Sequence, residues 1–254
     1  MSRLARSDLE HLLQARKLGP TLVTPALEPA APLDERMVCA TGLGSLDDLL
    51  RGGWPRGQVS EIVAPLSAGG TWVACASVAA ATRRGELAAL VDPLDRFDPE
   101  SAATAAFAWP YLLWVRGGAP DRAAEILAVE RAVKAVALLL RAEGFGLVVL
   151  DLQGVSSAAI KALPFTTWRR LQRMVEGRDA ACLLVHHAPL GRSAGGATLR
   201  LAPALRGGGC WAGQGSPGRR LVGLSAQVRV VRAQDPGASL DGVTWSTNDV
   251  RRSE

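Results

Sequence analysis

The sequence predicts a doubly wound α/β fold: a mainly parallel β-sheet with helices on both faces and an antiparallel edge strand near the C-terminus. Five short apolar runs alternate with stretches that can form helices, as expected for parallel strands joined by helical crossovers. The runs are apolar almost throughout, which indicates strands buried on both faces. The chain has 254 residues, of which 48% are hydrophobic and 21% charged, so it fits one globular α/β domain and excludes a disordered or fibrous protein.

The predicted strands and helices follow one another from residue 59 onward. Strands are expected at 59–63, 87–92, 111–115, 146–151 and 181–186, and helices at 71–84, 98–108, 120–143 and 158–177. Pro120 and Asp121 mark the start of the longest helix, and Gly144 follows its end. Four apolar residues at helical spacing predict the side of this helix that faces the core: Leu127, Val133, Val136 and Leu140.

The residues after the last of these strands depart from the pattern. Residues 221–233 alternate between apolar and polar, which predicts a half-buried strand or hairpin at the edge of the sheet. Residues 188–220 are rich in Gly, Pro and Arg and have no periodicity. A connection of that length without structure is uncommon, so we expect a functional loop or a disordered segment there.

The N-terminal residues predict a short helix followed by a linker. Leu9, Leu12 and Leu13 lie on one side of an expected helix at 7–18, and four prolines make residues 20–36 a semi-extended linker. The leucines need a surface to pack on, either the core of this chain or a partner. The predicted organisation is an N-terminal helix and Pro-rich linker (1–36), a core (37–233) and a short C-terminal tail (234–254).

The positive charge of the chain is concentrated in its second part. Residues 1–150 hold 15 Lys and Arg against 17 Asp and Glu, a net charge of −2, whereas residues 151–254 hold 14 against 7, a net charge of +7. A concentrated positive field favours polyanions such as nucleic acid or an acidic protein surface. A solvated basic surface without a partner is the alternative.

Cysteine usage and hydropathy indicate a cytoplasmic protein. The four cysteines are far apart and form no CxxC pair, so the sequence indicates neither a zinc cluster nor a disulfide framework. Charges interrupt every apolar stretch of the N-terminus, which argues against a secretory signal. The longest uncharged stretch, residues 62–82, is broken by Pro65, Gly69 and Gly70, so no membrane span and no membrane partner are expected.

The first turn between a strand and a helix is where an open α/β sheet binds ligands. Here that turn consists of Ala64, Pro65, Leu66, Ser67, Ala68, Gly69, Gly70 and Thr71. Compared with the phosphate-binding pattern G-x-x-x-x-G-K-[ST], it has Ala64 in place of the first glycine and Gly70 in place of the lysine. That lysine supplies positive charge to the β and γ phosphates. The sequence therefore predicts severely weakened triphosphate binding and hydrolysis.

Several segments, in the same order, resemble the core of the RecA recombinase family. They begin with TGLGSLDDLL at 41–50, GGWPRG at 52–57, VSEI at 59–62 and the degenerate turn. They continue with LVDPLDRFDP at 90–99, GLVVLD at 146–151, LLVHH at 183–187 and SAQVRV at 225–230. This resemblance implies a RecA-like core, with an ATP site at the degenerate turn and strand 146–151 in the position of the Walker B strand.

Matched residue by residue, the resemblance implies that the chemistry of the family has been lost. The catalytic glutamate of the family aligns with Leu94, its phosphate-binding lysine with Gly70 and its nucleotide-sensing glutamine with His187. His186 and His187 are adjacent at a strand end, so we expect them to face opposite ways, and no metal site is predicted.

Two residues of the ATP site remain. Thr71 and Asp151 match the magnesium ligand and the acidic residue behind it, although Asp151 is equally explained as a polar strand end. Asp95 substitutes for the missing glutamate only if the alignment slips by one residue. We therefore expect no cofactor and no catalytic activity, with a weak DNA-dependent ATPase or recombinase as the alternative.

A short RecA-like chain with an eroded phosphate loop resembles the ImuA family, accessory proteins of bacterial mutagenic translesion synthesis that are also linked to the cell-division inhibitor SulA. This resemblance implies a role in the SOS response to DNA damage, at the nucleoid. The implied partners are RecA, the polymerase-like ImuB and an error-prone DnaE-type polymerase. In RecA filaments the N-terminal helix and strand of each subunit pack on the next core. Leu9, Leu12 and Leu13 are therefore expected partner-binding residues, and a SulA-like inhibitor is a further alternative.

Direct binding of single-stranded DNA is the remaining interpretation. In the RecA family the loops after the Walker B and sensor strands line the DNA, and the corresponding stretches here are rich in arginine. The candidate DNA-binding residues are Arg169, Arg170, Arg173, Arg192, Arg200, Arg206, Arg219 and Arg220. Arginine contacts to phosphates give affinity that is independent of sequence and sensitive to salt. Trp168 and Trp211 are candidates for stacking on unpaired bases, with packing in the core as the alternative.

Overall fold

The computed structural model describes residues 35–102, 105–118, 121–190, 196–203, 209–212, 220–232 and 243–246, all within one compact unit, Pro32–Glu254. The expected helix at 7–18, with Leu9, Leu12 and Leu13, and the linker before residue 35 lie outside these residues. Among the helices that are described, none is both long enough and apolar enough to cross a bilayer.

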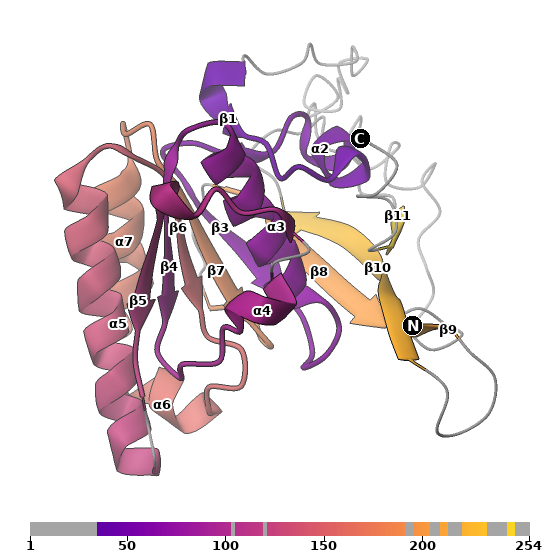
Figure 1. Cartoon of the computed structure of the whole chain (residues 1–254). Coiled ribbons are helices and arrows are strands. Elements are labelled where there is room, and N and C mark those ends of the chain that lie inside the picture. The colour runs from indigo at the N-terminus through magenta and orange to yellow at the C-terminus, as the bar shows by residue number, and fades with distance from the viewer. Residues whose placement is uncertain are drawn as a thin grey trace, which may run out of the picture. The chain divides into compact units, whose positions relative to one another are not determined.

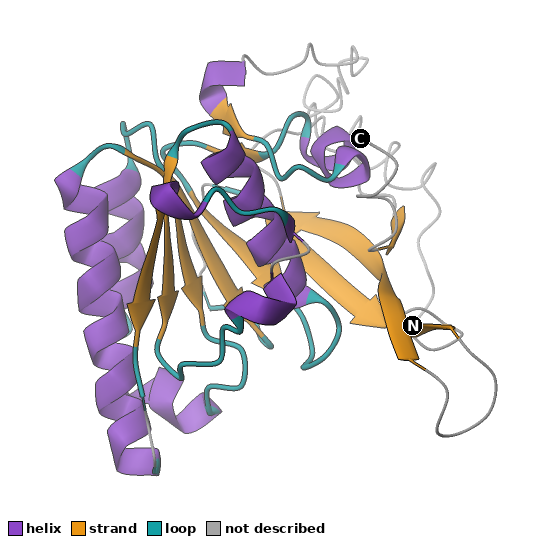
Figure 2. Cartoon of the chain, viewed as in Figure 1, coloured by secondary structure: helices purple, strands orange, loops and turns teal. Residues whose placement is uncertain are grey.

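A twisted central sheet organises the described residues (Figures 1 and 2). Its strands follow the order β11-β10-β8-β3-β7-β6-β4-β5, and β9 pairs with β10. They comprise β3 (Val59–Val63), β4 (Leu87–Asp92), β5 (Leu112–Arg116), β6 (Phe145–Asp151), β7 (Ala181–His186), β8 (Thr198–Pro203), β9 (Gly209–Ala212), β10 (Arg220–Arg232) and β11 (Val243–Ser246). The strands from β3 to β8 pair in parallel, whereas β10 is antiparallel to β8, β9 and β11. The predicted fold class is therefore confirmed.

Helices cover both faces of the sheet (Figure 1). They are α2 (Gly44–Leu50), α3 (Gly70–Arg83), α4 (Pro99–Ala102), α5 (Arg122–Ala142), α6 (Ser157–Ala162) and α7 (Thr167–Val175), with 3-10 turns at Glu35–Met37 and Trp109–Tyr111. A two-stranded ribbon of β1 (Val38–Cys39) and β2 (Trp54–Pro55) precedes β3. Helices α2 and α3 contribute to one hydrophobic core, and α5, α6 and α7 to a second core on the opposite face.

Two of the predicted helices differ from the structure because proline and backbone conformation interrupt them. The stretch 158–177 forms two helices, since Pro164 restricts Leu163 to an extended conformation with ψ of 144°. Within the stretch 98–108 the described α-helix is Pro99–Ala102, and Ala106 has a positive φ of 54°. Proline and left-handed residues both break the ladder of backbone hydrogen bonds that a continuous helix requires.

The C-terminal region contains more regular structure than its composition suggests. Residues 188–220 include β8 and β9, so the expectation of a segment without structure is wrong for those residues. Val243–Ser246, within the expected tail, forms β11 and pairs with Ser225–Val228 of β10. Long-range pairing supplies these strands with hydrogen-bond partners that local periodicity does not reveal.

Candidate functional site

The degenerate phosphate turn joins β3 to α3 at the carboxyl ends of the parallel strands. Ser67 and Gly69 have positive φ values, 62° and 92°, which give the turn its tight shape. The Ala64 N–H donates to the carbonyl of His186 over 2.9 Å, and the Ala68 N–H donates to the carbonyl of Pro65 over 3.1 Å. The turn is therefore tied to β7 and closed on itself by backbone hydrogen bonds.

Thr71 and Asp151, the two residues expected to remain from an ATP site, are in direct contact. The hydroxyl of Thr71 donates to Oδ2 of Asp151 over 3.0 Å, and the Gln153 N–H donates to Oδ1 over 2.9 Å. Burial raises the pKa of Asp151 to about 6, although these two hydrogen bonds oppose the rise. The structure thus brings together one hydroxyl and one partly buried carboxyl group at the start of α3.

The position of the expected catalytic glutamate holds an apolar residue. Leu94 packs against the hydrophobic core on the α5 side of the sheet. Both carboxylate oxygens of the neighbouring Asp95 accept hydrogen bonds from Arg116, each 2.8 Å long, and this pairing lowers the pKa of Asp95. Arg116 also lies over the ring of Trp114, 4.3 Å from its centroid. Asp95 is therefore engaged in an ion pair on the surface.

The two adjacent histidines lie together, so the expectation that they face opposite ways is wrong. Their ring centroids are 3.9 Å apart. Strand β7 ends at His186, and His187 follows in a bend, where the alternation of strand side chains no longer applies. Nε2 of His187 lies 3.3 Å from the hydroxyl of Ser157. In the described part of the chain, no group of three His, Cys, Asp or Glu side chains is placed to hold a metal ion.

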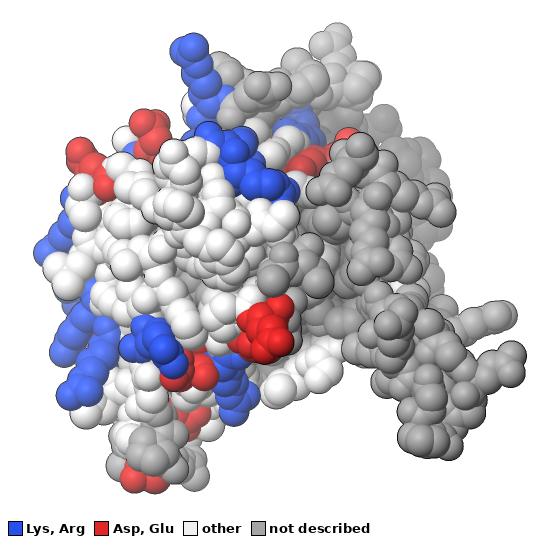
Figure 3. All heavy atoms as spheres, viewed as in Figure 1, with Lys and Arg blue, Asp and Glu red and all other residues white. Residues whose placement is uncertain are grey.

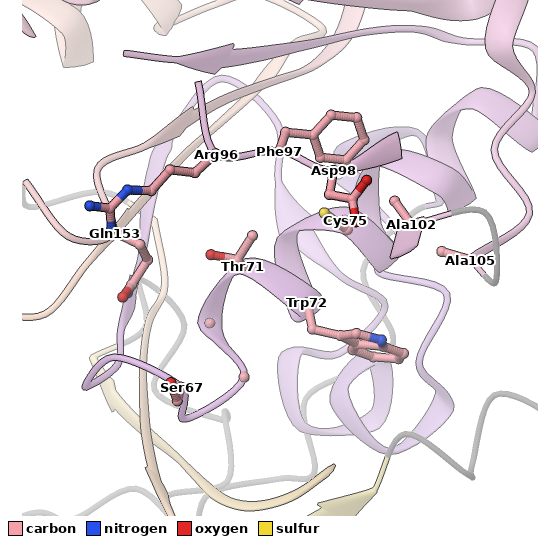
Figure 4. Close-up of a pocket in the computed structure, with 12 residues that line it drawn as sticks. Ser67, Thr71, Trp72, Cys75, Arg96, Phe97, Asp98, Ala102, Ala105 and Gln153 are labelled. Carbon is pink, nitrogen blue, oxygen red and sulfur yellow. The ribbon is translucent and has the colours of Figure 1, made fainter. Parts of the chain in front are cut away.

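A cavity of about 320 Å³ opens beside the turn (Figure 4). One wall is apolar and consists of Trp72, Cys75, Phe97, Ala102 and Ala105. The polar lining comes from Ser67, Thr71, Arg96, Asp98 and Gln153. Figure 4 shows Arg96 and Gln153 at one end of the cavity and Trp72 at the other, with Thr71 between them. The guanidinium of Arg96 packs against Gly154, just after the end of β6.

Strand β5 forms an edge of the sheet, which the sequence did not indicate. Among the described residues β5 pairs only with β4, and Trp109, Tyr111 and Leu113 are exposed beside it or on it. A run of apolar residues without alternation predicted a strand buried on both faces. The composition of one strand does not reveal its place in the sheet, because that place depends on which other strands pair with it.

A second cavity, of about 390 Å³, lies between this edge and α5. Its apolar lining comprises Val91, Val115, Ala124, Leu127, Ala128 and Ala132, and its polar lining includes Arg116 and Arg131. Leu127 is 44% exposed, so its predicted place in the core is wrong, whereas Val136 and Leu140 of the same stripe are buried. The stripe therefore enters the core only along the later turns of α5.

The arginine candidates that the structure describes lie on one side of the sheet. Arg169, Arg170 and Arg173 are exposed on α7, which packs in the second core. The residues flanking Arg200 on β8 and Arg229 on β10 pack in the first core, so these two arginines point to the α7 side. Arg200 and Arg229 are exposed and directly opposite each other in the ladder. Sequence reasoning missed Arg229, although its alternation with Val228 and Val230 contained the signal.

Of the two tryptophans, the structure describes the side chain of Trp168 alone, and it supports the alternative of packing in the core. Trp168 packs against the second core, whereas Phe165, in the short link between α6 and α7, is 88% exposed. Arg220 begins β10 and Trp211 lies on β9, but their side chains are not described. Arg192, Arg206 and Arg219 lie outside the described residues.

On the face shown in Figure 3, Lys and Arg side chains gather along the flank that α5 follows, and uncharged side chains cover the centre. The exposed cations of α5 are Arg131, Lys134 and Arg141. This α3-side face therefore offers little charge at its centre.

Comparisons with known proteins agree with this architecture. The family model of the RecA N-terminal domain matches residues 33–160, half of the chain. Protein RecA of Salinispora tropica is 36% identical over 121 residues, which cover 47% of this chain and 32% of that protein. Protein RecA of Arthrobacter sp. is 41% identical over 101 residues (39% and 28%), and that of Chlorobaculum tepidum 47% over 66 residues (26% and 19%).

These matches cover about a third or less of the length of the relatives. The residues matched by the family model include the turn at 64–71, Leu94 and Asp151, but end before His187 and before β8 to β11. The strand order, the position of the turn and the match over half of the chain lead to one conclusion: the chain belongs to the RecA family through its N-terminal domain.

Proposed function

We propose that this chain is a non-catalytic RecA-like protein of the DNA-damage response, of the ImuA type. In this proposal it binds RecA and the polymerase partners ImuB and a DnaE-type enzyme, promotes translesion synthesis and restrains recombination by RecA filaments. Membership of the RecA family supports a RecA-like role in the DNA-damage response. Gly70 and Leu94 stand where the family has its lysine and glutamate, and Asp95 is held by Arg116, which supports the absence of catalysis.

The edge formed by β5 and its cavity is the observation that carries the proposed RecA contact. An edge strand presents unpaired backbone groups that can accept a strand from another chain. The apolar cavity between β5 and α5 offers room for apolar side chains of a helix that follows or precedes such a strand. RecA subunits assemble through an N-terminal helix and strand, so a RecA subunit supplies both of these elements.

This contact leads to a mechanism for restraining filaments. RecA filaments hold ATP between adjacent cores, so each added subunit must support the nucleotide at its boundary. A subunit with Gly70 in place of the lysine offers less positive charge to the phosphates. A filament that ends on this chain would therefore add no further RecA subunit at the boundary that lacks the lysine. Translesion synthesis would then be favoured over strand exchange.

Two leucines of α5 provide the test. Leu127 lines the cavity, whereas Leu138 does not line it and is 64% exposed on the same helix. We expect Leu127→Asp to weaken binding to RecA at least tenfold, about 1.4 kcal/mol, and Leu138→Asp to leave it unchanged. Binding is measured by biolayer interferometry, with and without ATP and single-stranded DNA. Equal affinities for both variants and the unmodified chain would place the RecA contact elsewhere.

Binding of single-stranded DNA is a second candidate function, favoured by the basic side described above. Arg200 and Arg229 face each other directly, an arrangement that like charges disfavour unless an anion lies between or above them. The exposed ring of Phe165 precedes the three arginines of α7 and can stack on an unpaired base. Fluorescence anisotropy with an oligonucleotide tests this function. Affinity should fall as salt rises, and Arg229→Ala should reduce the salt slope by about 1; a salt-independent affinity would contradict it.

A further inference from the structure

The two positions at which the turn departs from the phosphate-binding pattern are coupled sterically. A Cβ atom placed on Gly70 would lie 2.9 Å from Cβ of Ala64 and 3.4 Å from a methyl group of Val185. Cβ atoms do not approach within 3.0 Å, so any side chain at position 70 requires the backbone to move. The pattern G-x-x-x-x-G-K avoids this clash, because its first residue is a glycine.

The side chain of Gln153 occupies the remaining space above Gly70. Its Nε2 would lie 3.2 Å from a Cβ at position 70, and it donates to the carbonyl of Ala64 over 3.1 Å. The backbone N–H of Gln153 donates to Asp151, so the residue is held at both ends. The Gln153 side chain thus crosses from the end of β6 to the end of β3, at the edge of the cavity in Figure 4.

We infer that Ala64 and Gln153 exclude a lysine side chain from position 70, so that substitution of Gly70 alone cannot restore the phosphate-binding cation. Ala64 blocks the path of a side chain at position 70, and Gln153 fills the place in which that side chain would begin. This inference rests on the proposed non-catalytic function and deepens it, because it names the residues that keep a cation away from position 70. If the missing lysine alone were responsible, Gly70→Lys would restore nucleotide binding.

Titration of the full chain with fluorescent MgADP and MgATP analogues separates these two explanations. Gly70→Lys alone should bind neither nucleotide more tightly than the unmodified chain. The triple variant Ala64→Gly/Gly70→Lys/Gln153→Ala should bind at least tenfold more tightly than Gly70→Lys. The matched control replaces Gln153 with Met in the same triple variant, which fills the space without the hydrogen bond. This control should bind as weakly as Gly70→Lys.

A stability measurement tests the clash without any nucleotide. Gly70 has no positive φ, so Gly70→Ala in the first turn of α3 would raise the melting temperature if space allowed. We expect the opposite, a lower melting temperature, and recovery of most of the loss in Ala64→Gly/Gly70→Ala. A higher melting temperature for Gly70→Ala, or nucleotide binding by Gly70→Lys equal to that of the triple variant, would overturn the inference.

The proposed function fails on a different result. Tight binding and turnover of MgATP by the unmodified chain would revive the weak ATPase alternative and refute the non-catalytic function. The Leu127→Asp experiment would still test RecA binding independently, because that contact involves a different cavity. Conversely, failure of the RecA experiment leaves the predicted coupling between positions 64 and 70 intact.

Discussion

At the scale of single residues, Asp151 should make stability depend on pH. Its pKa of about 6 in the folded state lies above the ordinary 3.8, so the folded state holds a proton that the unfolded chain releases. The free energy of unfolding should therefore fall as pH rises from about 4 to about 6, by at most about 3 kcal/mol. Asp151→Asn should raise the melting temperature at pH 7.5 and change it little at pH 4.

Asp95→Asn is the matched control for this measurement, because its expected pH dependence has the opposite sign. Hydrogen bonds from Arg116 lower the pKa of Asp95, so the folded state favours the ionised form. Its stabilisation is present at neutral pH and is lost as pH falls through the folded-state pKa. Asp95→Asn should therefore be neutral or slightly destabilising at pH 7.5. An equal gain for both variants would show that titration of Asp151 is not the cause.

At the scale of elements, Arg56 joins several strands at their amino-terminal ends, which lie opposite the turn. Its guanidinium donates to the carbonyls of Val38, Gly146 and Asp179 and to both carboxylate oxygens of Glu86, over 2.8 to 3.3 Å. Lysine cannot reproduce this planar set of donors. Arg56→Lys should therefore lower the free energy of unfolding by about 2–4 kcal/mol, measured by urea denaturation.

Arg84→Lys is the control for Arg56→Lys, since Arg84 contacts the same carboxylate from a more exposed position and its guanidinium otherwise donates to Sγ of Cys39 and the carbonyl of Ala40, both over 3.3 Å. The side chain of Arg84 is 35% exposed and that of Arg56 only 15%. Because exposed ion pairs contribute little, we expect a loss below about 1 kcal/mol for Arg84→Lys. Similar losses for both variants would mean that the carboxylate contact, rather than the joining of several strands, accounts for the effect.

At the scale of the whole molecule, the N-terminal segment should contribute to partner binding and not to the stability of the core. The family match begins at residue 33 and the described core at residue 35, so deletion of residues 1–32 should leave the melting temperature nearly unchanged. The same deletion should weaken RecA binding at least tenfold if Leu9, Leu12 and Leu13 dock on a RecA core. Unchanged affinity would refute docking through the N-terminal segment and leave the β5 edge as the proposed contact.

The α/β class, five strands of the sheet and the position of the turn at 64–71 could be predicted from the sequence. These features follow from short-range signals: apolar runs, the spacing of glycines and prolines, and a motif eight residues long. The single helix predicted at 158–177 was wrong, because Pro164 breaks it into α6 and α7.

Only tertiary contacts establish which strand lies at the edge, which side chains of α5 face solvent and what fills the space above Gly70. Each of these depends on contacts between residues far apart in the chain, such as the hydrogen bond between Gln153 and Ala64, 89 positions apart. Periodicity reports only whether a residue can be buried, whereas strand order and packing decide what it contacts. The sequence therefore identified a turn without its lysine, and the fold places Ala64 and Gln153 against the position where that lysine would stand.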